Sequence, residues 1–316
     1  MIAAARQLRL GTALYAAWLG AMMIYCLVRL GDQPDLVMPA TAATIGLWLA
    51  AAIAAAFERH SATQVACMLV SGFGIALLFE YLGSAHGLIF GEYDYTDLLG
   101  PRAFGVPVLI PAAWFMMLYP SWEIAGVLAP KRRTARVLIA AAAMTAWDLS
   151  LDPRMVADGA WIWPTGGVYF GIPLSNFAGW FVTATLIFAV WSLINRTQHV
   201  SSRGISSLPI LIYATTWLGE AGANALFWSG PQVAVIVFAA MGLFAVPAVL
   251  VSLRGYDLRP ARTSYADPLF DRIRPLARLR KLKPSQAVVN MAQHQVRSIP
   301  APVVESRSQM HSNDLA

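Results

Sequence analysis

Charged residues are scarce in this chain of 316 residues. Asp, Glu, Lys and Arg together make up 13% of the sequence, whereas they make up about a quarter of an ordinary soluble domain. Hydrophobic residues make up 58%. Such a chain has too few polar side chains to cover a water-exposed surface. The composition therefore excludes an ordinary soluble protein and predicts an integral membrane protein.

The sequence also lacks the usual signatures of metal and nucleotide sites. Its two cysteines, Cys26 and Cys67, lie in apolar runs, which favours small core side chains over a disulfide framework. Its five histidines show no metal-ligand spacing, and neither a C-x-x-C nor an H-E-x-x-H pattern occurs. No P-loop or dinucleotide-binding glycine motif is present. We therefore expect no metal, haem or nucleotide cofactor.

Long apolar runs, by contrast, are abundant. A helix of about 20 residues crosses the roughly 30 Å of hydrocarbon in a bilayer, and eight runs approach that length. They lie at about 10–30, 37–57, 62–83, 104–121, 134–152, 173–195, 208–228 and 231–254. We expect an all-α membrane protein with about eight transmembrane helices. In the fourth run, Pro107 and Pro111 are expected to interrupt the helix and Pro120 to end it.

The distribution of Lys and Arg predicts the topology, because basic loops stay in the cytoplasm. If the N-terminus is cytoplasmic, only Arg29, Arg102 and Arg154 face outward among the basic residues. Both termini are then cytoplasmic, in a multi-pass protein of the cell membrane. Arg6 and Arg9 precede the first run, which is longer than the apolar region of a signal peptide, so we expect this run to stay in the mature protein.

Composition changes after the last run. We interpret 1–254 as a polytopic transmembrane catalytic domain and 255–316 as a basic, disordered cytoplasmic tail, because the tail has no sustained apolar period. Its cluster RIRPLARLRKLKP at 272–284 is expected to rest on the anionic lipid headgroups of the bilayer rather than on nucleic acid.

Polar side chains gather near the outer ends of the expected helices. They come from four different runs and are Glu80, Asp148, Asp152, Asn176, Glu220 and Asn224. Two long outer loops, 84–103 and 153–172, add aromatic side chains, namely Tyr93, Tyr95, Trp161, Trp163 and Tyr169. Ionisable residues inside a membrane usually face the protein interior and mark function. The pattern predicts a polar pocket in the outer leaflet with the loops as its lid.

Two spacings sharpen this prediction. Asp148 and Asp152 are four residues apart, as are Glu220 and Asn224, so each pair shares one helix face. Burial and a like-charged neighbour favour the neutral form of a carboxyl. At least one of Asp148 and Asp152 is therefore expected to keep its proton at pH 7 and to be able to donate it.

Structural roles are the alternatives. Asp152 precedes Pro153 and would suit the N-cap of a short interfacial helix ended by Gly159. Asp148, Glu80 and Glu220 would then only hydrogen-bond neighbouring helices. The loop tyrosines and Trp161, Trp163 and Trp180 would anchor the protein at the lipid headgroups. Asp94 and Asp97 have the character of turn residues.

Three stretches resemble a known family. WDLSLDPRMV, GAWIWPTGGVYFGIPLSNFAGW and FGEYDYTDLLGPRAFGVPVLIPAAWFMMLYP are similar to the membrane carotenoid hydratases, which act on γ-carotene or lycopene ends or on bisanhydrobacterioruberin. The resemblance covers about residues 70 to 250. It implies an enzyme that adds water across the terminal double bond of an acyclic carotenoid, without a cofactor, and that works beside other enzymes of carotenoid biosynthesis.

This chemistry needs an acid, a cavity that tolerates a tertiary cation, and a held water. Asp148 is the expected proton donor, Asp152 its modifying neighbour and Glu220 the residue that orients the water, with Glu80 as a further candidate. The expected substrate-binding residues are Tyr93, Tyr95, Trp147, Trp161, Trp163, Tyr169, Asn176 and Asn224.

Two other functions stay open. The sequence DLSLD at 148–152 is similar to the aspartate-rich motif of membrane prenyltransferases, which would make the protein a carotenoid elongase that binds magnesium and diphosphate. A transporter or carotenoid-binding scaffold is the non-enzymatic alternative, in which the carboxyls would form a proton relay.

Overall fold

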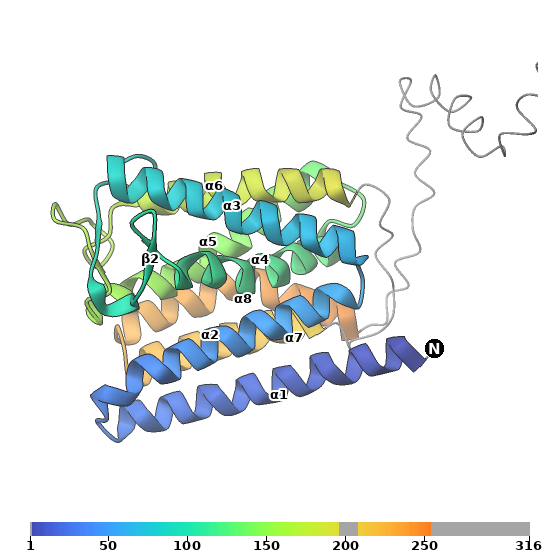
Figure 1. Cartoon of the computed structure of the whole chain (residues 1–316), viewed down its shortest axis with the longest axis horizontal. Helices are drawn as coiled ribbons and strands as arrows, with labels where there is room; N and C mark the ends of the chain where they lie inside the picture. Colours follow the sequence, from blue (N-terminus) through green and yellow to red (C-terminus); the bar gives the residue numbers. More distant parts are fainter. Residues whose placement is uncertain (1, 196–207, 254–316) are drawn as a thin grey trace, which may run out of the picture. The chain divides into compact units, whose positions relative to one another are not determined.

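A computed structural model describes residues 2–195 and 208–253 of the chain. Within these ranges the protein is a bundle of helices (Figure 1). The predictions for the tail at 255–316, including the basic cluster at 272–284, and for the segment 196–207 lie outside the described residues.

The eight expected helices are all present in the described part of the chain. They are α1 (Ile2–Leu30), α2 (Pro34–Phe57), α3 (Ala62–His86), α4 (Leu109–Leu128), α5 (Arg133–Ala157), α6 (Leu174–Ile194), α7 (Leu208–Leu226) and α8 (Pro231–Leu253). Consecutive helices run in opposite directions, so the connections 31–33, 87–108, 158–173 and 227–230 share one end of the bundle (Figure 1). We call this the site end, and the opposite end, where α1 begins, the amino-terminal end.

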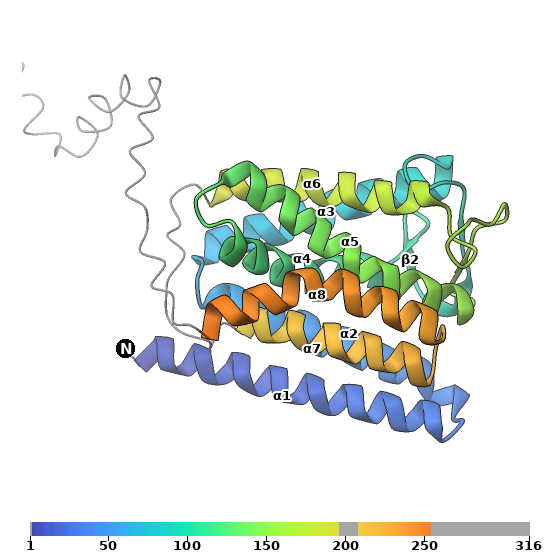
Figure 2. The ribbon, with the colours of Figure 1, turned by 180° about the vertical axis from the view of Figure 1, so that it is seen from behind.

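Six of these helices are long and apolar enough to cross a membrane, namely α1, α2, α3, α5, α6 and α8. The helices α4 and α7 fall short of that measure, since both carry Trp, Tyr, Pro and Glu among their apolar residues. In both views α3 and α6 lie on one side of the bundle and α1 on the other (Figure 1, Figure 2).

Helix α4 forms the centre of the bundle. It packs against α2, α3, α5, α7 and α8, and almost every residue from Ile110 to Gly126 is buried. A helix enclosed by protein has no lipid-facing side, so it tolerates polar and aromatic residues that a peripheral span excludes. On α2, Ala51, Ala52, Ala55 and Ala56 are fully buried, and these small side chains allow close approach of the neighbouring helices.

The prediction for the start and end of the fourth helix was wrong. Residues Arg102–Ala103 (β2) and Val106–Pro107 (β3) pair as a short antiparallel hairpin before α4 begins. Pro111 lies in the first turn of α4, where a helix does not need the missing N–H. Pro120 lies inside the helix, which continues to Leu128.

The two long loops at the site end fold together. Asp94–Tyr95 (β1) pairs with Trp161–Ile162 (β4), and Thr96 Oγ1 donates to the Gly159 carbonyl at 2.7 Å. A 3-10 turn, η1 (Asp97–Leu99), follows β1. These contacts bring side chains that are about 65 residues apart in sequence onto the same end of the helices.

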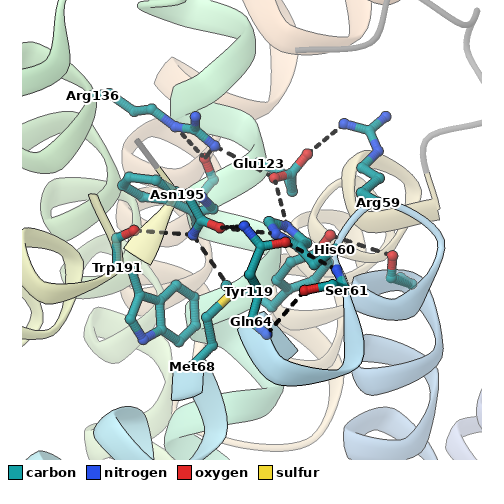
Figure 3. Close-up of polar contacts among 12 residues, drawn as sticks. Arg59, His60, Ser61, Gln64, Met68, Tyr119, Glu123, Arg136, Trp191 and Asn195 are labelled. Atoms are coloured by element: carbon teal, nitrogen blue, oxygen red, sulfur yellow. Dashed lines mark hydrogen bonds and ion pairs between the residues drawn. The ribbon is translucent and has the colours of Figure 1, made fainter. Parts of the chain in front are cut away.

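A buried ionic cluster closes the amino-terminal end (Figure 3). Glu123 of α4 lies between Arg59, in the turn between α2 and α3, and Arg136 of α5, and the Arg136 guanidinium stacks 3.7 Å from the Trp122 ring centre. His60 Nδ1 lies 3.0 Å from Asn195 Oδ1. Burial lowers the pKa of His60, so its ring is a neutral hydrogen-bonding partner. The sequence did not predict this cluster, because its members are far apart in the chain.

Replacing Glu123 by Gln should destabilise the bundle by about 3 kcal/mol, because removing one partner of a buried ion pair leaves buried charge uncompensated. The Arg59–Glu123 pair is largely buried, with side-chain exposures of 21% and 6%. The measurement is the thermal unfolding midpoint of the detergent-purified protein.

The matched control is Asp97→Asn, which removes the exposed pair between Arg102 and Asp97. An exposed pair contributes only about 0–1 kcal/mol, so this variant should unfold close to the wild type. Equal losses of stability in the two variants would contradict a stabilising role for the buried ion pairs of Glu123.

Candidate active site

A cavity opens at the site end, between the helices and the folded loops. Its empty space, which includes open solvent at the mouth, is about 370 Å³. Helices α3, α4, α5 and α6 and both loops form its walls. The lining residues are Glu80, Phe90, Tyr93, Tyr95, Ile110, Ala113, Trp114, Leu151, Asp152, Trp161, Trp163, Asn176 and Trp180.

One wall carries a pair of carboxyls. Asp148 and Asp152 lie one turn apart on α5 and are almost completely buried. The Asn176 amide of α6 donates to both, at 3.1 Å to Asp148 Oδ2 and by a short hydrogen bond to Asp152 Oδ2. Only Asp152 lines the cavity. Asp148 lies deeper, and its Oδ1 has no hydrogen-bond partner among the described residues.

Glu80 of α3 is the carboxyl of another cavity wall, and three donors surround it. Its Oε2 accepts from the hydroxyls of Tyr93 at 2.6 Å and Tyr95 at 2.7 Å, and its Oε1 accepts from Trp114 Nε1 at 2.8 Å. Burial and the neighbouring Glu80 hold the pKa of both tyrosines well above the ordinary value. Both hydroxyls therefore remain protonated and act as donors.

Aromatic rings fill much of the remaining wall. Trp114 and Trp180 stack with ring centres 4.0 Å apart and planes 10° apart. Trp163 packs on Tyr93 at 5.6 Å, and Trp161 meets the edge of Tyr95 at 5.9 Å. Trp161, Trp163 and Trp180 are buried, so the alternative in which they are headgroup anchors does not match their position.

The structure does not bring Glu220 and Asn224 to the cavity. Glu220 of α7 accepts from Ser150 Oγ at 2.7 Å and from Trp147 Nε1 at 3.4 Å, and Asn224 donates to the same Ser150 oxygen at 2.7 Å. Successive residues of a helix are about 100° apart, so Ser150 faces nearly away from the aspartate pair. Glu220, Asn224 and Trp147 thus form a second polar cluster, on the other side of α5.

The predicted N-cap role of Asp152 was wrong, because α5 continues through Pro153 to Ala157. A proline inside a helix cannot donate to the carbonyl four residues earlier, which here is that of Leu149. The Tyr169 hydroxyl, from the second loop, donates to this carbonyl at 2.8 Å. Tyr169 is therefore a support for α5 between the two aspartates rather than a residue of the cavity wall.

The predicted site residues did not include six residues that line the cavity, namely Phe90, Ile110, Ala113, Trp114, Leu151 and Trp180. Each lies within an apolar stretch and looks like an ordinary core residue. Trp114 carried the strongest available signal, since a buried indole N–H usually needs a partner. Its partner, Glu80, is 34 residues away in sequence. Among the described residues, no group of three or more His, Cys, Asp or Glu side chains is arranged to hold a metal.

Tyr169→Phe should destabilise the protein by about 1 kcal/mol, because it leaves the partly buried Leu149 carbonyl without its donor. Pro153→Ala restores the N–H that can satisfy the same carbonyl within the helix. In the Pro153→Ala background the Tyr169→Phe change should therefore cost about 1 kcal/mol less. A double-mutant cycle of thermal unfolding midpoints tests this, and an equal cost in both backgrounds would contradict the supporting role.

Comparison with known proteins identifies the family. The bisanhydrobacterioruberin hydratase of Haloarcula japonica is 30% identical over 142 residues, which are 44% of this chain and 47% of the relative. The matched region thus spans about half the length of that protein. No solved structure matches the chain. The model of a family described as carotenoid biosynthesis protein matches residues 38–247, which include every residue that lines the cavity. The chain therefore belongs to the carotenoid biosynthesis protein family.

Proposed function

We propose that the protein is a carotenoid hydratase, a hydro-lyase that adds water across the terminal carbon–carbon double bond of an acyclic carotenoid end to give a tertiary alcohol. One observation carries the proposal. The cavity has a carboxyl held by an amide on one wall, a carboxyl held by three donors on another, and stacked tryptophans beside them. The relative from Haloarcula japonica is a hydratase by name, which agrees with this chemistry.

Asp152 is assigned as the proton donor, in place of Asp148, because Asp152 lines the cavity. Its proton goes to the less substituted carbon of the terminal double bond, whose π electrons form the new C–H bond. Positive charge then develops on the tertiary carbon. Trp114 and Trp180 line the cavity, and aromatic rings stabilise a nearby cation. Asp148 shares the Asn176 amide with the donor and fixes its position.

Glu80 is assigned as the base, in place of Glu220. Its Oε1 accepts one hydrogen bond and keeps a lone pair for a water molecule. The water oxygen forms the C–O bond, and the water proton passes to Glu80. Return of that proton to Asp152 through solvent completes the cycle, with one alkene and one water consumed per alcohol formed. Side chains and water suffice for these steps, so cofactor independence is part of the proposal.

Ile110, Ala113 and Leu151 give the cavity an apolar side, which suits the hydrocarbon end of a polyene that otherwise stays in lipid. Glu220, with Ser150 and Asn224, is assigned a positioning role for α5. Tyr93, Tyr95, Trp161 and Trp163 are assigned to substrate binding.

The proposed setting is the cell membrane, crossed by all eight helices with both termini in the cytoplasm. The direction of the helices supports this topology. The connection between α4 and α5 and the start of α5 hold Lys131, Arg132 and Arg133. Arg59 lies in the connection between α2 and α3, and both connections lie at the amino-terminal end of the bundle (Figure 1). The cavity then lies in the outer leaflet. Residues 1–254 would suffice for catalysis, and other carotenoid-biosynthesis enzymes would supply the substrate.

Expression in bacteria that make lycopene, γ-carotene or bisanhydrobacterioruberin tests the reaction. We expect a product heavier by one water, with its oxygen taken from ¹⁸O-labelled solvent. Asp152→Asn and Glu80→Gln should each lower conversion by about 10²- to 10⁴-fold, the usual contribution of a general acid or base. Pigment chromatography with mass detection, normalised to protein level, measures the effect.

Asp94→Asn is the matched control and should leave conversion unchanged. Asp94 is an exposed carboxyl in the loop that carries Tyr93 and Tyr95. Near-normal conversion by Asp152→Asn together with loss in Asp148→Asn would assign the proton to Asp148. Unchanged pigment with every substrate would favour a binding scaffold. A product extended by a prenyl unit would favour the magnesium-dependent elongase.

A further inference from the structure

A large apolar side chain occupies the tip of the hairpin formed by β2 and β3. Its turn consists of Phe104 and Gly105, with φ of 53° and 81°. Both residues are in the left-handed region, where two-residue hairpin turns favour Asn-Gly. A bulky residue there is strained, because its Cβ lies too close to the following carbonyl oxygen. Phe104 is nevertheless 79% exposed, so the fold gains little from its burial in return for the strain.

The exposure of Phe104 does not come from a loosely held hairpin. Arg102 donates to the Tyr95 carbonyl at 2.8 Å, and the Val108 N–H donates to the Pro101 carbonyl at 3.0 Å. Val106 is fully buried. The hairpin is thus anchored on one side and presents Phe104 outward on the other.

The surroundings of the tip are apolar as well. Val108, which follows the hairpin, is 47% exposed, and β3 packs against α3. Leu78, on the outer half of α3, is 52% exposed, and α3 is one of the helices long and apolar enough to cross the membrane. In Figure 1 the hairpin lies alongside the outer part of α3 rather than beyond its end. Exposed apolar side chains thus occur both on a spanning helix and on the hairpin that packs against it.

We propose that the hairpin at 102–107 is a membrane-inserted element, whose Phe104 tip contacts the lipid acyl chains of the leaflet at the site end. Insertion would offset the strain, since transfer of an apolar side chain from water to hydrocarbon is favourable. The same loop supplies Tyr93 and Tyr95 to the cavity wall, so the lipid contact belongs to a segment that builds the site. The proposal does not depend on the reaction assigned to the cavity.

Spin labelling in liposomes of phosphatidylcholine and phosphatidylglycerol tests this contact. In a background where Cys26 and Cys67 are replaced by Ala, a nitroxide is attached to Phe104→Cys. Its collision rates with oxygen, which concentrates in acyl chains, and with a water-soluble nickel complex are compared. Leu78→Cys supplies the lipid reference, and Asp94→Cys, in the same loop, supplies the water reference.

The label at Phe104 should match Leu78, with oxygen collisions favoured severalfold over nickel collisions. A ratio equal to that of Asp94 would overturn the proposal. A second measurement separates lipid contact from a role in folding. Phe104→Asn suits the left-handed turn and should leave the unfolding midpoint in detergent unchanged or higher. A clear decrease of that midpoint would show that Phe104 supports the fold itself, and would also overturn the proposal.

Discussion

The hydrogen-bonding demand of carboxyls buried inside an apolar bundle organises this protein. An ionisable group removed from water is tolerated only when partners surround it. Glu80 obtains its three donors from two sources, the loop tyrosines Tyr93 and Tyr95 and the central helix residue Trp114. The loop 87–108 therefore folds back over the helix ends, and in this position it covers the cavity. The polar site and the loop architecture are two consequences of the same constraint.

Helix α5 separates two polar clusters by its geometry alone. Its aspartates face α6, and Asp152 also lines the cavity, whereas Ser150, between them in sequence, faces Glu220 and Asn224 of α7. The proline that follows the second aspartate frees one carbonyl, and Tyr169 from the second loop satisfies it. The loops thus contribute to the site twice, once as donors to Glu80 and once as a support for the helix that carries the aspartates.

Buried carboxyls have different partners at the two ends of the bundle. At the amino-terminal end, Glu123 is balanced by arginines, so the cluster is ionic and structural. At the site end, the carboxyls Asp148, Asp152 and Glu80 have amide, phenol and indole partners in place of cations. A carboxyl without a paired cation is the kind that can exchange a proton during a reaction. This difference is the electrostatic basis for assigning chemistry to one end and stability to the other.

The sequence by itself determined the eight helices, most of their bounds and the family, because apolar length and local motifs are properties of contiguous residues. It also indicated that Glu80, Asp152, Tyr93 and Tyr95 belong to one region. Only the tertiary structure decided which carboxyls line the cavity and that Glu220 does not. It determined that Trp114 is the third hydrogen-bond donor to Glu80. It also decided that 102–107 form a hairpin and that Glu123 joins two arginines. These outcomes depend on which helix faces meet, and packing between distant segments sets that relation, which no local pattern of residues records.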